Sequence, residues 1–152
     1  MDFYDFYNYG LLGLFAICFI ASSLFPLGSE AFVIGFLALG FKPALVLVVA
    51  SIGNILGSLS TYYLAYFGGA LALQRFFAKS QPKLEAYAPW VRRHGALAAF
   101  LSFLPFIGDV LVLLLGLYRY SPLMTWIFIS LGKVARYSLL IYLYALLDID
   151  LS

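Results

Sequence analysis

The 152-residue chain is poor in charge, cysteine and histidine, and each shortage excludes a class of protein. Charged residues make up 11% of the sequence, whereas an ordinary soluble domain carries roughly a quarter, so the chain has too few polar groups to cover a soluble globule. Cys18 is the single cysteine, which excludes an internal disulfide and a multi-cysteine metal site. His94 is the single histidine, which excludes a histidine-based metal site or catalytic triad. We therefore predict no metal, no cofactor and no enzymatic activity.

Apolar sequence, by contrast, is abundant and arranged in long runs. Hydrophobic residues make up 64% of the chain, and its mean hydropathy is +1.00. This composition excludes intrinsic disorder, which requires low hydrophobicity. The runs cover residues 10–27, 28–40, 43–70, 95–117 and 122–147. The chain is therefore predicted to be one all-helical integral membrane domain over residues 1–152.

Two of these runs are long enough to cross a bilayer. A membrane-spanning helix needs about 20 apolar residues, so residues 43–70 and 122–147 are predicted to be full spans. Residues 10–40 are too short for two crossings and too long for one. Whether residues 10–25 form a complete span or one arm of a hairpin stays open.

Residues 10–40 and residues 95–117 are each interrupted by a proline and a glycine, which are followed by a carboxylate. The breaks fall at Pro26 and Gly28, before Glu30, and at Pro105 and Gly108, before Asp109. Irregular backbone at membrane depth persists only where protein or a water-filled cavity surrounds it. Each break therefore favours a discontinuous helix or a re-entrant helical hairpin.

The two breaks belong to an internal repeat. Glu30 matches Asp109, which lies 79 residues further on, and no gap is needed on either side. The same offset pairs Ser23 with Ser102, Pro26 with Pro105, Val33 with Val112, Pro43 with Pro122, Ser51 with Ser130, Gly53 with Gly132, Tyr63 with Tyr142 and Leu64 with Leu143. Each unit is a hairpin followed by a span, so the second unit enters the membrane from the opposite side. The sequence thus predicts an inverted repeat, with repeat 1 over about residues 10–70 and repeat 2 over about residues 95–147.

A basic linker of about residues 71–94 separates the repeats. Its polar part, residues 74–94, contains one acid, Glu85, and the cations Arg75, Lys79, Lys83, Arg92 and Arg93. Cytoplasmic loops are enriched in Lys and Arg, so we expect this loop in the cytoplasm and the acidic chain ends outside. The acidic residues at the ends are Asp2, Asp5, Asp148 and Asp150. The aromatic residues between these cations favour a helix that lies in the membrane interface. The net charge of the chain, +2, is too small to suggest a nucleic-acid partner.

Four charges lie inside the apolar segments, where each costs about 2.5–3.5 kcal/mol at a helix centre. Glu30 and Asp109 follow the two breaks, and Lys133 and Arg136 lie one helical turn apart in the last span. Asn54 takes the place of Lys133 in the first repeat. Opposite charges at similar depth can neutralise each other. These five residues are the candidate site.

The candidate site has two interpretations. In the structural one, static ion pairs fix the hairpins to the spans. In the functional one, Arg136 and Lys133 bind an anionic headgroup, because Arg offers a planar fork suited to phosphate and Lys a mobile point charge. Glu30 and Asp109 would then bind and release protons, as desolvated carboxylates can. The expected partners are membrane lipids and protons.

Five segments, in this order along the chain, carry a resemblance to a known family: Pro26-Leu27-Gly28-Ser29-Glu30, Gly53-Asn54-x-x-Gly57, Arg93-His94-Gly95, Leu101-Ser102-Phe103-Leu104-Pro105-Phe106-Ile107-Gly108-Asp109 and Leu131-Gly132-Lys133-Val134-Ala135-Arg136-Tyr137. They resemble the DedA superfamily of VTT-domain, or SNARE-associated Golgi-type, membrane proteins, and within it the short YqaA-like bacterial branch. The resemblance covers nearly the whole chain.

This resemblance implies a helical domain of the bacterial inner membrane with two re-entrant hairpins. It also implies transport or scrambling of lipids, including undecaprenyl phosphate in some bacterial members, often linked to the proton-motive force. Glu30 matches the family acid that follows the first break. The chain departs from the family pattern at Ser102 and Gly108, where typical members carry Arg, and near Cys18, where a further family acid is absent.

We therefore predict a transporter, flippase or scramblase for an anionic lipid or lipid-linked phosphate, with proton coupling. In this prediction Lys133 and Arg136 supply the cations that are missing from the family pattern. Two alternatives stay open: a structural or assembly factor that transports nothing, and a channel or exporter for small ions. The large lateral surface of so short a chain leaves a homodimer open as well.

Overall fold

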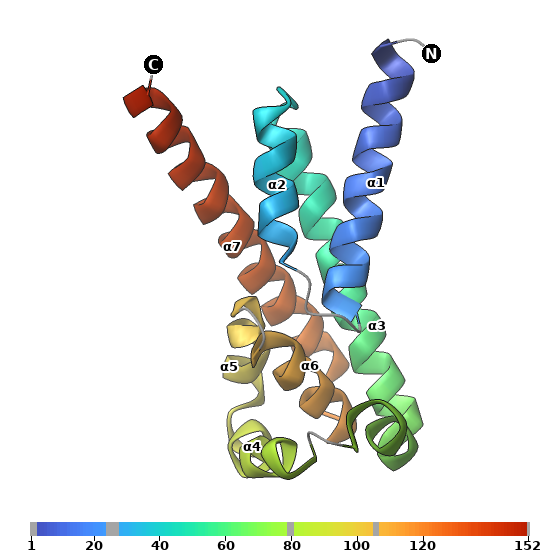
Figure 1. Ribbon diagram of the computed structural model, residues 1–152. Helices are drawn as coiled ribbons and strands as arrows, with labels where there is room; N and C mark the ends of the chain where they lie inside the picture. Colours follow the sequence, from blue (N-terminus) through green and yellow to red (C-terminus); the bar gives the residue numbers. More distant parts are fainter. Residues whose placement is uncertain (1–2, 24–27, 79–80, 105–106, 152) are drawn as a thin grey trace.

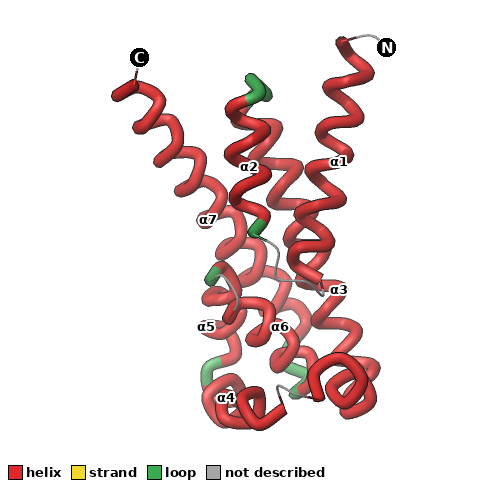
Figure 2. The backbone as a smooth tube through the Cα atoms, in the orientation of Figure 1, coloured by secondary structure: helices red, strands yellow, loops and turns green. Residues whose placement is uncertain are grey.

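A computed structural model of the protein describes residues 3–23, 28–78, 81–104 and 107–151, and this part of the chain is helical without strands (Figures 1 and 2). The elements are α1 (Phe3–Ser23), α2 (Ser29–Ala38), α3 (Pro43–Phe77), α4 (Gln81–Arg93), α5 (Gly95–Phe100), the 3₁₀ turn η2 (Leu101–Phe103), α6 (Ile107–Leu117) and α7 (Pro122–Leu151). The predicted all-helical class is confirmed. Six residues that the sequence argument used lie outside the described residues: Asp2, Pro26, Leu27, Lys79, Pro105 and Phe106.

Within the described residues, two helices are long and apolar enough to cross a membrane. They are Pro43–Gly69 within α3 and Pro122–Leu147 within α7, which are the two ranges predicted as full spans. Each helix begins at a proline, whose missing N–H has no helical partner to lose in the first turn and whose φ is already helical. The two helices run in opposite directions and cross beside each other (Figure 1).

The remaining apolar helices turn back in the middle of the molecule. α1 runs from the end that holds both chain termini to the middle, and α2 returns toward the same end (Figure 1). α5 and η2 approach the middle from the opposite end, and α6 returns there (Figure 1). The apolar parts of α2 and α6, Ser29–Ala38 and Ile107–Leu117, are far shorter than a span. α2 and α6 therefore each extend only from the middle of the molecule toward one of its ends (Figure 1).

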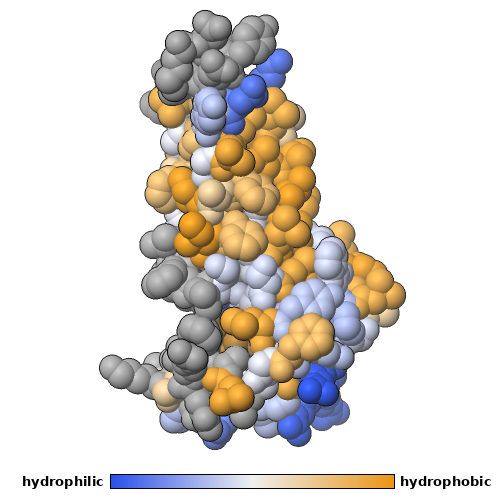
Figure 3. Space-filling view, turned by 90° about the vertical axis from the view of Figure 1, so that its right-hand side faces the viewer, coloured by the Kyte–Doolittle hydropathy of each residue, from blue (hydrophilic) through white to orange (hydrophobic). Residues whose placement is uncertain are grey.

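The basic linker lies at the end of the molecule away from the chain termini (Figure 1). α3 kinks at Gly69, whose φ of 50° and ψ of −133° are accessible to a residue without Cβ. On α4, Val91 is buried while the neighbouring Arg92 and Arg93 are exposed. In the space-filling view, apolar side chains cover much of the surface between the ends, and strongly hydrophilic ones gather at the ends (Figure 3). α4 is therefore amphipathic, as an interfacial helix must be.

Two apolar clusters form the core, and each surrounds one turn-back. The cluster near the chain termini consists of Leu14, Cys18, Val33, Leu37, Phe41, Val46, Ala50 and Tyr137. The cluster near the basic linker consists of Leu59, Tyr62, Ala65, Val91, Ala98, Ala99, Leu111–Leu115 and Ile129. Along α3 and α7, the inward-facing residues between the clusters include four that are polar and buried: Ser51, Asn54, Ser58 and Lys133. A polar layer thus separates two apolar cores.

Glycines allow α1 and α3 to approach closely. A Cβ on Gly53 would lie 2.6 Å from the carbonyl oxygen of Phe15, and one on Gly57 would contact that of Phe19. Small residues at such positions let membrane helices pack by backbone contact. Gly53 and Gly57 therefore allow the backbones of α1 and α3 to come into contact.

We expect Gly57→Ala to destabilise the protein by about 1–3 kcal/mol, because the added methyl group meets a backbone carbonyl that moves only with its helix. The measurement is the midpoint of thermal unfolding in detergent micelles. Gly13→Ala is the matched control, since a Cβ there has open space around it and alanine is the better helix former. Equal midpoints for the two variants would contradict the close contact.

Candidate functional site

Lys133 is the most deeply buried of the predicted site residues that carry charge, with 2% of its side chain exposed. Its Nζ lies 3.8 Å from Oδ1 of Asp109 in the first turn of α6, and it donates a 3.4 Å hydrogen bond to Oγ of Ser22 on α1. Ser22 in turn shares a 2.5 Å hydrogen bond with Ser58 on α3. Lys133 of α7 therefore connects α1, α3 and α6 in the polar layer.

Glu30 and Arg136 form a second ion pair, which is less enclosed. Glu30 lies in the first turn of α2, and its Oε1 pairs with Nη2 of Arg136 on α7. The exposed fractions are 30% for the Glu30 side chain and 16% for that of Arg136. Beside the pair, the buried Tyr137 shares a 2.8 Å hydrogen bond with Ser29. The start of α2 is thus held to α7 by an ion pair and a hydrogen bond.

The two acids occupy equivalent places in their helices. Glu30 and Asp109 both lie in the first turn, where the aligned peptide dipoles leave partial positive charge and stabilise an anion. Their partners, Arg136 and Lys133, lie one turn apart on α7. The structure therefore brings the four predicted charges together as two separate ion pairs along one helix.

Asn54, the fifth predicted residue, is buried in α3. Its Nδ2 donates a 3.4 Å hydrogen bond to the backbone carbonyl of Cys18. Its Oδ1 has no hydrogen-bond partner among the described residues, and the same holds for the hydroxyl oxygens of Ser51 and Ser102. A buried polar atom without a partner costs about 1–3 kcal/mol, so the polar layer is not fully satisfied by the described side chains and backbone.

The two glycines of the predicted breaks have different surroundings. Gly28 directly precedes α2 and is exposed. Gly108 lies in the first turn of α6, and a Cβ there would contact the carbonyl oxygen of Ser102. Gly108 therefore lets η2 and α6 approach, and the chain has no room at this position for the Arg of the family pattern.

The residues that connect the ion pairs to their surroundings were not predicted from the sequence. Ser29 and Tyr137 are the direct neighbours of Glu30 and Arg136 in sequence, which is one available signal. A second signal is the repeat, because Ser58 and Tyr137 are 79 residues apart and each bonds to a serine at one end of the α1–α2 connection. The role of Ser22 had no such signal.

A groove of about 410 Å³ opens beside the second ion pair. Apart from Glu30 and Arg136 its lining is apolar: Phe100, Phe103, Ala135, Leu139, Leu140 and Leu143. Leu139 and Leu143 are 59% and 48% exposed, so this wall lies on the outer surface of α7. Lys133 and Asp109 do not line the groove. We call it the Arg136 groove.

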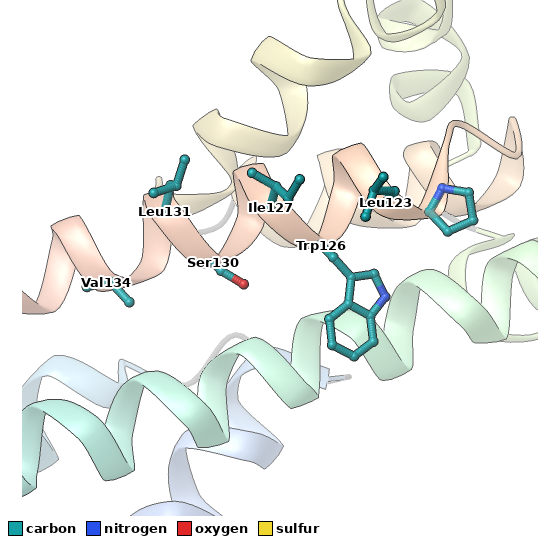
Figure 4. A pocket seen from close by; sticks show the side chains of 7 residues that line it. Leu123, Trp126, Ile127, Ser130, Leu131 and Val134 are labelled. Carbon is teal, nitrogen blue, oxygen red and sulfur yellow. The ribbon is translucent and has the colours of Figure 1, made fainter.

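A larger hollow of about 790 Å³ follows the outer face of α7 nearer its start (Figure 4). Its lining is Pro122, Leu123, Trp126, Ile127, Ser130, Leu131 and Val134. The hydroxyl of Ser130 is the single polar side-chain group of the hollow apart from the indole N–H of Trp126, which donates to Tyr63. None of these lining residues is charged, so they offer no counter-charge to an anionic headgroup.

The fold and its site define a class: a helical membrane protein whose charged residues are paired between its helices. The VTT domain family matches residues 25–146. The chain is 36% identical over 130 residues to inner membrane protein YqaA of Escherichia coli, covering 84% of this chain and 85% of that protein. It is 31% identical over 160 residues to a protein of Haemophilus influenzae, covering 94% and 96% of the two chains. No solved structure matches.

The chain therefore belongs to the VTT-domain, or DedA, family, and it is similar to YqaA over most of its length. The family resemblance predicted from the five sequence segments is confirmed. The chain is a membrane protein of this family.

Proposed function

We propose that the protein moves an anionic lipid or lipid-linked phosphate across the membrane, and that the Arg136 groove binds this substrate. One observation carries the proposal: the groove has a charged pair at one place and apolar walls elsewhere. An amphiphile with an anionic headgroup has the same division of polarity. A site built for a small hydrophilic ion would instead have polar walls.

Arg136 is the headgroup contact in this proposal. A guanidinium presents N–H donors in a fixed planar fork that matches two oxygens of a phosphate. The walls from Phe100, Phe103 and Leu139 would contact the hydrocarbon chain. Because Leu139 and Leu143 are exposed on α7, a lipid could enter sideways from the bilayer without crossing water.

Lys133 has a different role, since its side chain is enclosed and does not line the groove. We assign Lys133 and Asp109 to holding the polar layer together at the start of α6. Glu30, which lines the groove, is the carboxylate that would carry the proton in a coupled cycle. Of the two cations that the sequence suggested for the headgroup, Lys133 and Arg136, the proposal therefore keeps Arg136.

The proposal includes a topology. α1–α2 and α5–α6 would be re-entrant hairpins that enter from opposite sides, and α3 and α7 would cross, which makes an inverted repeat. The opposite directions of the two turn-backs support this (Figure 1), as do the acids in the first turns of α2 and α6. The basic residues 74–94 would face the cytoplasm of a bacterial inner membrane. The Escherichia coli relative is named as an inner membrane protein, which supports this location.

This topology predicts that the C-terminus lies outside the cytoplasm. A C-terminal fusion to alkaline phosphatase, which is active only outside the cytoplasm, is therefore expected to be active in intact cells. The matched control is a fusion of green fluorescent protein at the same end, which is expected to be dark. A fluorescent fusion with inactive phosphatase would place the C-terminus in the cytoplasm and contradict the topology.

The function is tested by lipid movement in liposomes that contain the purified protein. A headgroup-labelled anionic lipid is expected to exchange between leaflets faster with the protein than without it, and a pH gradient is expected to change the rate. A non-transporting assembly factor would produce no movement under any gradient. A channel for small ions would dissipate an ion gradient without moving lipid.

A further inference from the structure

The ion pair in the Arg136 groove constrains how an anion can bind there. Arg136 already pairs with Glu30, and both side chains line the groove. We propose that the groove binds the anionic headgroup and a proton together, with the headgroup at Arg136 and the proton on the carboxylate of Glu30. This inference rests on the proposed function and specifies its coupling: the proton moves with the lipid and not against it.

A headgroup in the groove and the Glu30 carboxylate compete for one cation, Arg136. An anion that reaches Arg136 from the groove lies within a few ångströms of the Glu30 carboxylate, because the two residues are in contact. Two negative charges beside one guanidinium repel each other, and such repulsion is relieved when one of them takes up a proton. A phosphodiester holds its negative charge more firmly than a carboxylate, so the proton goes to Glu30.

Among the described residues, no second side-chain cation faces Glu30 to offset the added charge. On α7, Lys133 is buried and paired with Asp109 of α6, and Tyr137 is a buried phenol that bonds to Ser29. On α1 the titratable group at this level is the buried thiol of Cys18. The described residues of η2 and α5 that line the groove, Phe100 and Phe103, are apolar. Arg136 is therefore the cation that faces Glu30 directly.

The charge balance of the site also favours uptake of the proton. Glu30, Asp109, Lys133 and Arg136 sum to zero before a substrate binds. A monoanionic headgroup makes the sum minus one, and one proton on Glu30 restores it to zero. Net charge among apolar side chains is costly, so binding of the anion and binding of the proton favour each other. For a monoanion the loaded site carries no net charge.

By linkage, the two binding events strengthen each other by the same factor. The affinity for the anion is expected to rise by up to about tenfold for each unit by which the pH falls, in the range where Glu30 takes up its proton on binding. About one proton is expected to enter from solution for each anion bound. An exchange mechanism would give the opposite sign, with protons released.

The probe is dioctanoyl phosphatidylglycerol, whose single phosphodiester stays ionised from about pH 6 to about pH 8. Its binding to the full-length protein in phosphatidylcholine nanodiscs is measured by calorimetry, in pairs of buffers that differ in ionisation enthalpy, which gives the number of protons taken up. Glu30→Gln is expected to bind with an affinity that does not depend on pH and with no proton uptake. Glu85→Gln, which changes an exposed carboxylate on α4, is the matched control and is expected to behave as wild type.

The outcomes separate this inference from the function on which it rests. Proton uptake that occurs with the wild type and is lost in Glu30→Gln supports co-binding. If the variant does not fold, proton uptake measured with the wild type still supports it. Co-binding is overturned if Arg136→Ala abolishes binding but the affinity of the wild type does not change with pH, or if binding releases protons. Either result leaves the proposed function standing. The absence of any binding that depends on Arg136 overturns both.

Discussion

Arg136→Ala is expected to slow the movement of an anionic lipid at least tenfold while the protein stays folded. The substitution removes the guanidinium that lines the groove, and a hydrogen bond to a charged group contributes about 1.5–3 kcal/mol. The loss of Arg136 leaves Glu30 without its partner, but Glu30 is 30% exposed and lies in the first turn of α2. Hydration and the helix dipole therefore limit the effect on folding.

The measurement is the rate at which a headgroup-labelled anionic lipid in protein-containing liposomes becomes accessible to an impermeant quencher. Arg136→Lys is expected to retain part of the rate, because it keeps the charge and loses the planar fork. Arg93→Ala is the matched control, since Arg93 is exposed at the end of α4 and does not line the groove. A wild-type rate of lipid movement in a folded Arg136→Ala protein would contradict the proposed binding site.

Asp109→Ala is expected to destabilise the protein by about 3–5 kcal/mol, because it leaves the ammonium group of Lys133 buried without its ion-pair partner. The remaining contact of Lys133, the 3.4 Å hydrogen bond to Ser22, cannot replace a negative charge. Replacing both charges, as in Asp109→Ala with Lys133→Met, is expected to recover much of the lost stability, since an apolar pair needs no compensating charge.

The free energy of unfolding in detergent micelles checks both expectations. Glu30→Ala serves as the comparison, because it breaks the other ion pair, whose cation is 16% exposed and remains partly solvated. Its loss of stability is expected to be clearly smaller than that of Asp109→Ala. Equal losses, or a double variant less stable than the single one, would contradict the different enclosure of the two pairs.

Much of the architecture followed from the sequence because it depends on local properties. The spans within α3 and α7 could be predicted from length and hydropathy alone, since a helix that satisfies its own backbone needs only an apolar surface of sufficient length. The prolines that open both helices and the breaks before Glu30 and Asp109 are likewise local features. The family followed from segments spread in order along the chain.

The candidate charges were also visible in the sequence, because ionisable residues are rare in apolar segments and each needs a compensating partner there. Which acid pairs with which base was not visible in the sequence. Either acid could have met either base, since Lys133 and Arg136 are one turn apart on the same helix. The choice depends on where the starts of α2 and α6 meet α7, and those contacts join residues more than a hundred positions apart for Glu30 and Arg136.

The sequence by itself therefore determined a membrane protein with two spans, two breaks and a small set of charges among apolar residues. Only the tertiary structure decided that Lys133 is enclosed while Arg136 lines an open groove. The physical reason is that enclosure is a property of neighbours. Asp109 of α6 and Ser22 of α1 contact Lys133, and Ser58 of α3 bonds to Ser22, whereas α7 beyond Arg136 continues along an exposed apolar face.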